Sequence, residues 1–120
     1  MYSGLLIKES LRDQAVLDRL RITKEDTWDI DDAAEGQSTV WNVAWFEIEE
    51  DAIDETVEAL SAALELGKWF LEITNDDTMI VVFPGKVFSY KKGDENGRAE
   101  AKVFGRSIGI PEHQLDWEED

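Results

Sequence analysis

Basic side chains near the carboxyl-terminal end of the chain are the residues whose type and spacing could best hold an anion. The group comprises Lys91, Lys92, Arg98, Lys102 and Arg106. Its last three members recur every four residues, an interval that drifts by about 40° on an α-helix and keeps them on one face. Guanidinium and ammonium groups bind phosphate and carboxylate, so the group predicts an anion-binding surface. Alternatively, these bases pair with acidic residues of the same molecule or of a second copy.

Tryptophan is the second residue type with a chemical use, since the chain has 5 tryptophans in 120 residues. Trp41, Val43 and Trp45 alternate, so in a strand they lie on one side, and Trp69 stands near the start of the next predicted strand. Each indole can bury a large apolar area while offering one hydrogen-bond donor. Base-stacking platforms surround their aromatics with basic residues, which Trp41 and Trp45 lack. We therefore predict that these residues belong to the core or to a face for a partner or ligand.

Acidic residues gather in two runs without a base, over residues 25–35 and 47–58. Calcium and magnesium ions prefer oxygen ligands, which makes a cation site one interpretation. An EF-hand loop that opened at Asp29 would place Ala34 at its glycine position and Val40 at its closing glutamate, so we predict no metal site. The runs are then solvated surface. They could also dock to a basic protein or mimic a nucleic acid, because charge of this size steers association.

Nucleophiles, catalytic bases and phosphate loops are scarce, which argues against an enzyme. Cysteine is absent, His113 is the only histidine, and no Gly-x-Ser-x-Gly motif is present. The glycine spacing matches neither a phosphate loop nor a dinucleotide fingerprint, so we predict no cofactor. A buried pair of carboxylates could still transfer protons, because burial raises their pKa values, but the sequence does not identify such a pair.

Composition indicates one acidic domain over residues 1–120. The chain has 12 basic and 28 acidic residues, a net charge of −16, and 42% hydrophobic residues from which to build a core. That charge opposes direct binding to nucleic-acid phosphates. The sequence has no apolar run near the ~20 residues of a membrane span and no cysteine for disulfides. We therefore expect a soluble, cytoplasmic protein with no membrane association.

Periodicity predicts the elements that must position these residues. The strongest strand covers 39–49, where apolar side chains on both faces indicate a central strand covered on two sides. The strongest helix covers 52–66, in which apolar residues repeat at helical spacing before Gly67 as a carboxyl-terminal cap. Further strands are predicted over 3–8, 22–30, 68–74, 79–83 and 86–91, and further helices over 11–20, 95–108 and a short segment after Pro111.

Local details refine three of these elements. Pro84 and Gly85 stand in the order of a type II turn, which tight hairpins do not favour, so the pairing of 86–91 with its predecessor is expected to be loose or bulged. Trp117 in a charged tail indicates an end that packs against the domain. The helix over 95–108 is expected to face the core with Val103, Phe104 and Ile108.

The predicted fold class is α+β, a mainly antiparallel sheet of five to six strands with three helices. The first six elements, in the order βαββαβ, resemble the ferredoxin-like arrangement, followed by an extra short strand and a carboxyl-terminal helix. The resemblance implies that both helices of the core cover one face of the sheet. The other face would carry Trp41, Val43, Trp45 and Trp69. Bare apolar area of that size is unusual on a monomer, so the third helix and tail, a second subunit or a ligand must cover it.

These expectations lead to three hypotheses about function. The first is a non-enzymatic acidic interaction module that binds a partner protein or forms a homodimer through the aromatic sheet face. The alternative is a small-ligand-binding protein or weak enzyme that recognises an anionic metabolite beside the basic helix over 95–108. A nucleic-acid mimic is a further alternative, because its acidic surface would compete with DNA for a basic protein.

Overall fold

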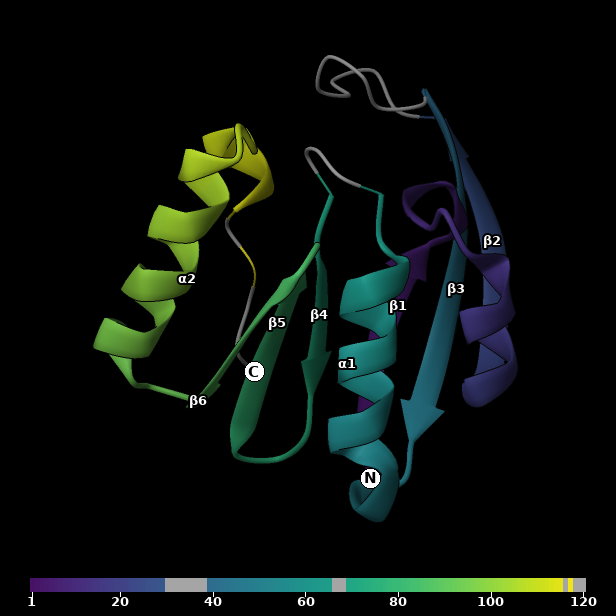
Figure 1. Cartoon of the computed structure of the whole chain (residues 1–120), viewed down its shortest axis with the longest axis horizontal. Coiled ribbons are helices and arrows are strands. Elements are labelled where there is room, and N and C mark those ends of the chain that lie inside the picture. Colours follow the sequence, from purple (N-terminus) through teal and green to yellow (C-terminus); the bar gives the residue numbers. More distant parts are fainter. Residues whose placement is uncertain (30–38, 66–68, 116, 118–120) are drawn as a thin grey trace.

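Six antiparallel strands form one sheet in the order β2-β3-β1-β4-β5-β6, as Figure 1 shows. This computed structural model describes residues 1–29, 39–65, 69–115 and 117. The strands are β1 (Tyr2–Ile7), β2 (Arg21–Asp29), β3 (Val40–Ile48), β4 (Leu71–Thr74), β5 (Thr78–Phe83) and β6 (Lys86–Lys91). The helices are α1 (Ile53–Ala63) and α2 (Glu95–Ser107), accompanied by 3₁₀ segments over Lys8–Ser10, Gln14–Arg19, Glu50–Ala52 and Glu112–Gln114. The α+β class and the antiparallel sheet predicted from the sequence are confirmed.

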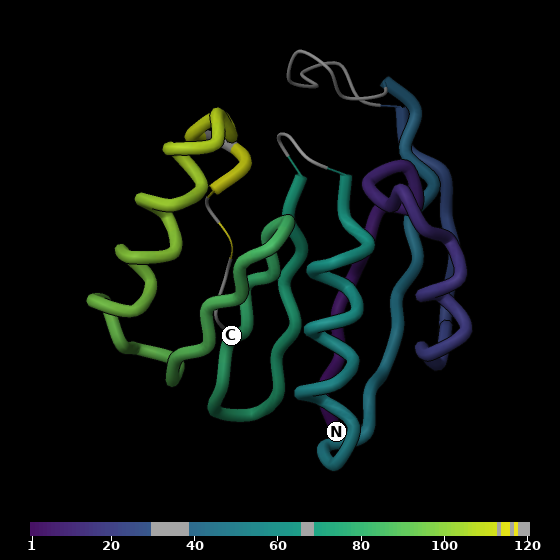
Figure 2. The backbone as a smooth tube through the Cα atoms, in the orientation of Figure 1, coloured from purple at the N-terminus to yellow at the C-terminus, as the bar shows by residue number. Residues whose placement is uncertain are grey.

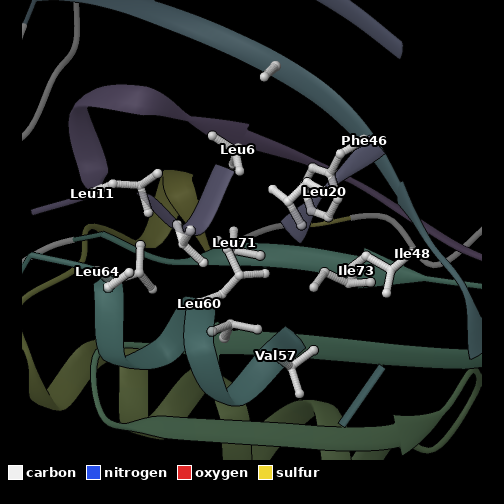
Figure 3. Packing of buried hydrophobic residues seen from close by; sticks show 14 of the residues in the cluster. Leu6, Leu11, Leu20, Phe46, Ile48, Val57, Leu60, Leu64, Leu71 and Ile73 are labelled. Carbon is white, nitrogen blue, oxygen red and sulfur yellow. The ribbon is translucent and has the colours of Figure 1, made fainter. Parts of the chain in front are cut away.

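One face of the sheet packs against α1. Leu6 of β1, Phe46 of β3 and Ile73 of β4 are buried there together with Leu60 of α1, as Figure 3 shows. These positions share a face because side chains alternate along each strand. Burial of each large apolar side chain contributes about 1.5–3 kcal/mol. None of the described helices, α1 included, is long and apolar enough to cross a membrane.

The other face is covered over β5 and β6 by α2 and by the chain that follows it. Met79, Val81 and Phe83 of β5 are buried there with Leu115 and Trp117. Figure 2 shows this last segment turning back from the end of α2 toward the sheet. Trp117 is 3% exposed, which confirms that this residue of the tail packs against the domain. The sheet therefore separates two cores, one on each face.

Small side chains bring α2 close to the sheet. A Cβ atom at Gly97 would lie 2.6 Å from the Cβ atom of Tyr90 in β6, and Ala101, one turn later, is fully buried. Val103 is 59% exposed, so its predicted place in the core is wrong, whereas Phe104 is partly buried against this core. The apolar pattern misplaced Val103 because the helix presents its smallest residues to the sheet, where close packing leaves least room.

The helix predicted over 52–66 ends earlier, at Ala63. Leu64 takes an extended conformation and forms an isolated antiparallel bridge with Leu11. The backbone N–H of Arg12 donates to the carbonyl of Ala63 at 2.8 Å. The chain after α1 therefore exchanges helical hydrogen bonds for pairing with a distant segment. The predicted cap at Gly67 lies outside the described residues.

The α-helix predicted over 11–20 is wrong. Residues Gln14–Arg19 form a 3₁₀ segment that begins at Asp13, whose side chain accepts a hydrogen bond from the N–H of Ala15. The bridge between Leu11 and Leu64 keeps the start of this stretch extended, and the residues that remain are fewer than the ~12–15 at which an isolated helix becomes stable. The short helix predicted after Pro111 is one 3₁₀ turn, so the described residues contain two α-helices instead of three.

The hairpin between β5 and β6 is regular, without the loose pairing expected from its turn. Its register runs without a shift from Phe83 opposite Lys86 to the far end of the strands. Gly85 has a φ of 76°, which suits glycine at the third position of a type II turn. The hydroxyl of Ser61 in α1 donates to the carbonyl of Phe83 at 2.7 Å, and the N–H of Gly85 donates back to the carbonyl of Ser61. The helix thus holds the turn in place.

Candidate functional site

A pocket of about 610 Å³ opens on the face of the sheet opposite α1. It lies over β3, β1 and β4, beside the part of that face which α2 and the tail cover. The main lining side chains come from four parts of the chain. They are Leu5 of β1, Trp41 and Trp45 of β3, Trp69 and Glu72 at β4, and Gln114 of the 3₁₀ turn after α2.

Strand register places the central residues of the pocket side by side. Leu5 is directly opposite Trp45 on one neighbouring strand and opposite Glu72 on the other. Directly paired residues in an antiparallel sheet project to the same face with Cβ atoms about 5 Å apart. An indole, an apolar side chain and a carboxylate therefore form one row across three strands.

Tryptophans gather beside this row. The rings of Trp41 and Trp69 have centroids 5.5 Å apart, and those of Trp28 and Trp45 are 5.9 Å apart in an edge-to-face arrangement. Trp41 and Trp45 are partly buried, whereas Trp69 is only 7% exposed. The structure therefore brings three members of the predicted aromatic face to the pocket. Val43, the fourth, is fully buried and is not among the pocket's lining residues.

A cationic group already contacts one of the clustered indoles, Trp45. The Lys24 ammonium nitrogen lies 4.7 Å from the ring centroid of Trp45. Elsewhere, the guanidinium carbon of Arg98 lies 5.4 Å from the ring centroid of Trp117. Both distances are within the range of a cation–π interaction. The indoles of this sheet face are accordingly placed to attract positive charge.

Glu72 is a candidate site residue that sequence reasoning missed. Its carboxylate has no hydrogen-bond or ion-pair partner among the described residues, although every fully buried side-chain nitrogen or oxygen of those residues does. Its oxygens therefore reach the pocket that Glu72 lines. Desolvation raises the pKa of Glu72 to about 7, and the positive charge of Arg98 opposes that rise. The sequence does carry one signal for this residue, because Glu72 is a single acidic residue between Leu71 and Ile73 in a short apolar strand.

The predicted anion-binding residues on α2 contact the chain's own carboxyl-terminal segment. Arg106 forms an ion pair with Glu112, and its hydrogen bond lowers the pKa of that carboxyl. Arg98 donates to the carbonyl of Trp117 at 2.6 Å, and the Lys102 ammonium lies 5.9 Å from the centroid of the same indole. The helical stripe predicted from the sequence thus exists, and it contacts Glu112 and Trp117.

The other two bases of that group lie at the end of β6. Lys91 closes the strand opposite Thr78, and the N–H of Lys92 donates to the carbonyl of Asp77 at 2.9 Å. None of the five predicted anion-binding residues lines the pocket, among the residues that the structure describes. The structure therefore separates the basic group from the aromatic pocket.

The arrangement can bind a molecule that is largely apolar and carries one polar or charged group. Apolar and aromatic side chains supply the contact area, while Glu72 and Gln114 supply polar atoms. Among the residues that the structure describes, no group of three or more histidine or acidic residues is placed to hold a metal ion. Comparison of the chain with protein-family models, with curated proteins and with solved structures finds no match.

Proposed function

We propose that this protein binds a small organic molecule in the aromatic pocket between β3 and β4. The observation that carries the proposal is a cavity of about 610 Å³ beside the partly buried rings of Trp41 and Trp45. Pockets for small molecules commonly have volumes of about 300–1,000 Å³, apolar walls and a few polar groups. The pocket has each of these properties, with Leu5 and the indoles as apolar surface and Glu72 as a polar group.

A small molecule suits this site better than a partner protein or a second copy of the chain. α2 and the tail already occupy the face over β5 and β6, where Phe83 and Trp117 are buried. The exposed remainder is a recess, and a stable protein interface buries about 800 Å² on each partner. A ligand that enters the recess covers the remaining indole surface without a large flat contact. Self-association through the same face is the outcome that would favour the interaction module instead.

We also propose that the fold is ferredoxin-like, and the strand order supports this. β3 lies between β1 and β2, as in a split βαβ unit, and β4 pairs with the other edge of β1. The 3₁₀ segment Gln14–Arg19 would then stand in place of the first crossover helix. This likeness concerns architecture, and the function rests on the pocket alone.

N-phenyl-1-naphthylamine, a neutral fluorescent probe of apolar sites, tests the proposed function. We expect saturable binding, with energy transfer from tryptophan to the probe. Trp45→Ala should weaken that binding about fivefold to tenfold, because it removes a large aromatic surface from the pocket. Val103→Ala, which changes an exposed residue of α2, should bind the probe like the wild type.

Two results would overturn the proposal. One is the absence of saturable probe binding by a folded wild-type protein. The other is equal affinity for the wild type and Trp45→Ala. Sedimentation of the unliganded protein provides the comparison with the alternative, since a dimer that Trp45→Ala dissociates would assign the aromatic face to self-association.

A further inference from the structure

We propose that the molecule bound in the aromatic pocket is an organic cation, an apolar body that carries a protonated amine or a quaternary ammonium group against Glu72. This inference rests on the proposed function and specifies the chemical class of the ligand. It follows from three features of the described pocket: the sign of its charged residues, the surroundings of Glu72, and the indoles beside it.

The charged side chains among the described lining residues are both acidic. They are Glu47 and Glu72, and no lysine, arginine or histidine stands with them in that lining. Glu47 lies 4.0 Å from the guanidinium of Arg21, so part of its charge is offset within the protein. Glu72 has no such ion pair among the described residues. A ligand in the pocket therefore meets one carboxylate that forms no ion pair with any residue the structure describes.

Apolar neighbours make that carboxylate costly to ionise. The residues directly paired with Glu72 on the adjacent strands are Leu5 and Val81. Arg98 is the charged group that acts on it, and the Arg98 guanidinium already donates to the carbonyl of Trp117. Desolvation prevails over Arg98, since the pKa of Glu72 is raised to about 7. Charged groups in apolar surroundings are usually paired, and a bound cation would supply the missing partner.

The indoles beside Glu72 favour the same charge. Trp41, Trp45 and Trp69 line the pocket, and the negative face of an aromatic ring attracts ammonium groups. The contact between Lys24 and Trp45, at 4.7 Å, is an example within this protein. The net charge of −16 would also attract a cation toward the molecule. An anionic ligand would instead meet two carboxylates, and a neutral one would leave Glu72 without a counterion.

Three probes of similar size and different charge test this inference: benzylamine, which is protonated at neutral pH, benzyl alcohol and benzoate. Calorimetric titration at about pH 8, where Glu72 is ionised, should show that benzylamine binds about tenfold more tightly than benzyl alcohol. Benzoate should bind most weakly. Glu72→Gln should reduce the preference for benzylamine to less than about twofold while leaving benzyl alcohol binding in place.

Two further measurements separate charge recognition at Glu72 from the general charge of the protein. Glu58→Gln makes the same change of charge on α1, on the opposite face of the sheet, and should keep the full preference. For the wild type, lowering the pH to about 5.5 protonates Glu72 and should remove the preference, although benzylamine stays charged. This second measurement needs no variant and therefore does not depend on whether Glu72→Gln folds.

The outcomes distinguish this inference from the proposed function. If benzyl alcohol and N-phenyl-1-naphthylamine bind but benzylamine has no advantage, the pocket binds ligands and the inference about their charge is wrong. Tightest binding of benzoate would also overturn it, and would favour the anion-binding hypothesis. If none of the probes binds, the proposed function itself fails. A preference that survives in Glu72→Gln would assign recognition of the cation to another group.

Discussion

Glu72 shows how one side chain can be costly to the fold and useful to a site. Its strand needs apolar residues on the α1 face, and Leu71 and Ile73 supply them. The carboxylate between them projects to the opposite face, beside Leu5 and Val81. Burying an ionised carboxylate in such surroundings without a partner opposes folding. A residue with this cost is a candidate for binding or catalysis, because perturbed pKa values concentrate at functional sites.

The raised pKa of Glu72 makes stability depend on pH in a defined direction. The ordinary pKa of this side chain is 4.5, and its pKa in the folded protein is about 7. Between these two pH values, Glu72 holds a proton in the native state that it releases in the unfolded chain. The contribution of Glu72 to the free energy of unfolding is therefore fully present below about pH 4.5 and is lost as the pH rises to about 7. The loss amounts to at most about 3 kcal/mol, because part of the carboxylate reaches solvent.

Urea unfolding of the wild type and Glu72→Gln at several pH values measures this effect. The variant cannot ionise, so its free energy of unfolding should rise relative to that of the wild type across the interval and then level off above about pH 7. A difference between the two proteins that stays constant with pH would contradict the assignment. Glu58→Gln, on the exposed surface of α1, should show no such trend.

α2 packs close to the sheet because the residues on its inner face have small side chains or none. Gly97 and Ala101 let the helix approach β6, and Gly105 lies under Leu115 in the same way. The side chain of Asp94 caps the helix by accepting hydrogen bonds from the N–H groups of Asn96 and Gly97. This cap and the small residues fix where the helix starts and how close it lies. The 3₁₀ turn that follows α2 contributes Gln114 to the lining of the pocket.

Gly97→Ala should separate α2 from the sheet. The new Cβ atom would lie 2.6 Å from the Cβ atom of Tyr90, which is anchored to β6 and cannot turn away. Overpacking of this kind costs about 1–3 kcal/mol, which exceeds the gain of up to about 1 kcal/mol from replacing glycine in a helix. We therefore expect a net loss of about 1–2 kcal/mol in the free energy of unfolding.

Urea unfolding monitored by circular dichroism tests this expectation. Glu100→Ala, an exposed change on the same helix, should alter stability by less than about 0.5 kcal/mol. A Gly97→Ala variant as stable as the wild type would show that α2 can shift without cost, and the close approach would then have no energetic role.

The whole molecule combines compact packing with strong self-repulsion. Its radius of gyration is 13.4 Å, close to the ~13.6 Å expected for a compact domain of this length. Two cores on opposite faces of one sheet give that compactness. The net charge of −16 opposes it, because like charges on a small domain repel each other. Ion pairs such as Arg106 with Glu112 offset only a few of these charges.

Salt should therefore stabilise the protein. Raising the NaCl concentration from about 0.02 M to about 0.5 M shortens the range of charge repulsion well below the size of the molecule. The midpoint of thermal unfolding should rise by about 3–8 °C, which corresponds to roughly 1 kcal/mol for a domain of this size. Near pH 4.5, where carboxylates begin to bind protons, the rise should be smaller. A fall in the midpoint with salt would show that attractive ion pairs outweigh the repulsion.

Local pattern was sufficient for much of the sheet and for the presence of both α-helices. The alternation of Trp41, Val43 and Trp45 predicted a central strand, and the structure places β3 inside the sheet with Val43 fully buried. The predicted cover on both faces is incomplete, because Trp41 and Trp45 are only partly buried and line the pocket. The same alternation predicted that Trp41 and Trp45 share a face. These predictions succeeded because the two-residue period of a strand and the 3.6-residue period of a helix are properties of the chain itself. Trp69, which precedes β4, also lines the pocket and contacts the ring of Trp41.

Only the tertiary structure decided where α1 ends, which residues of α2 face the sheet, and which side chains meet in the pocket. Ala63 ends α1 because Leu64 pairs with Leu11, a residue more than fifty positions earlier in the chain. Glu72 lines the same pocket as the indoles because β1 lies between β3 and β4, so that Leu5 stands between Trp45 and Glu72. Such neighbours depend on the order and register of strands that are distant in sequence. That order minimises the free energy of the whole sheet and its two cores, and no local period encodes it.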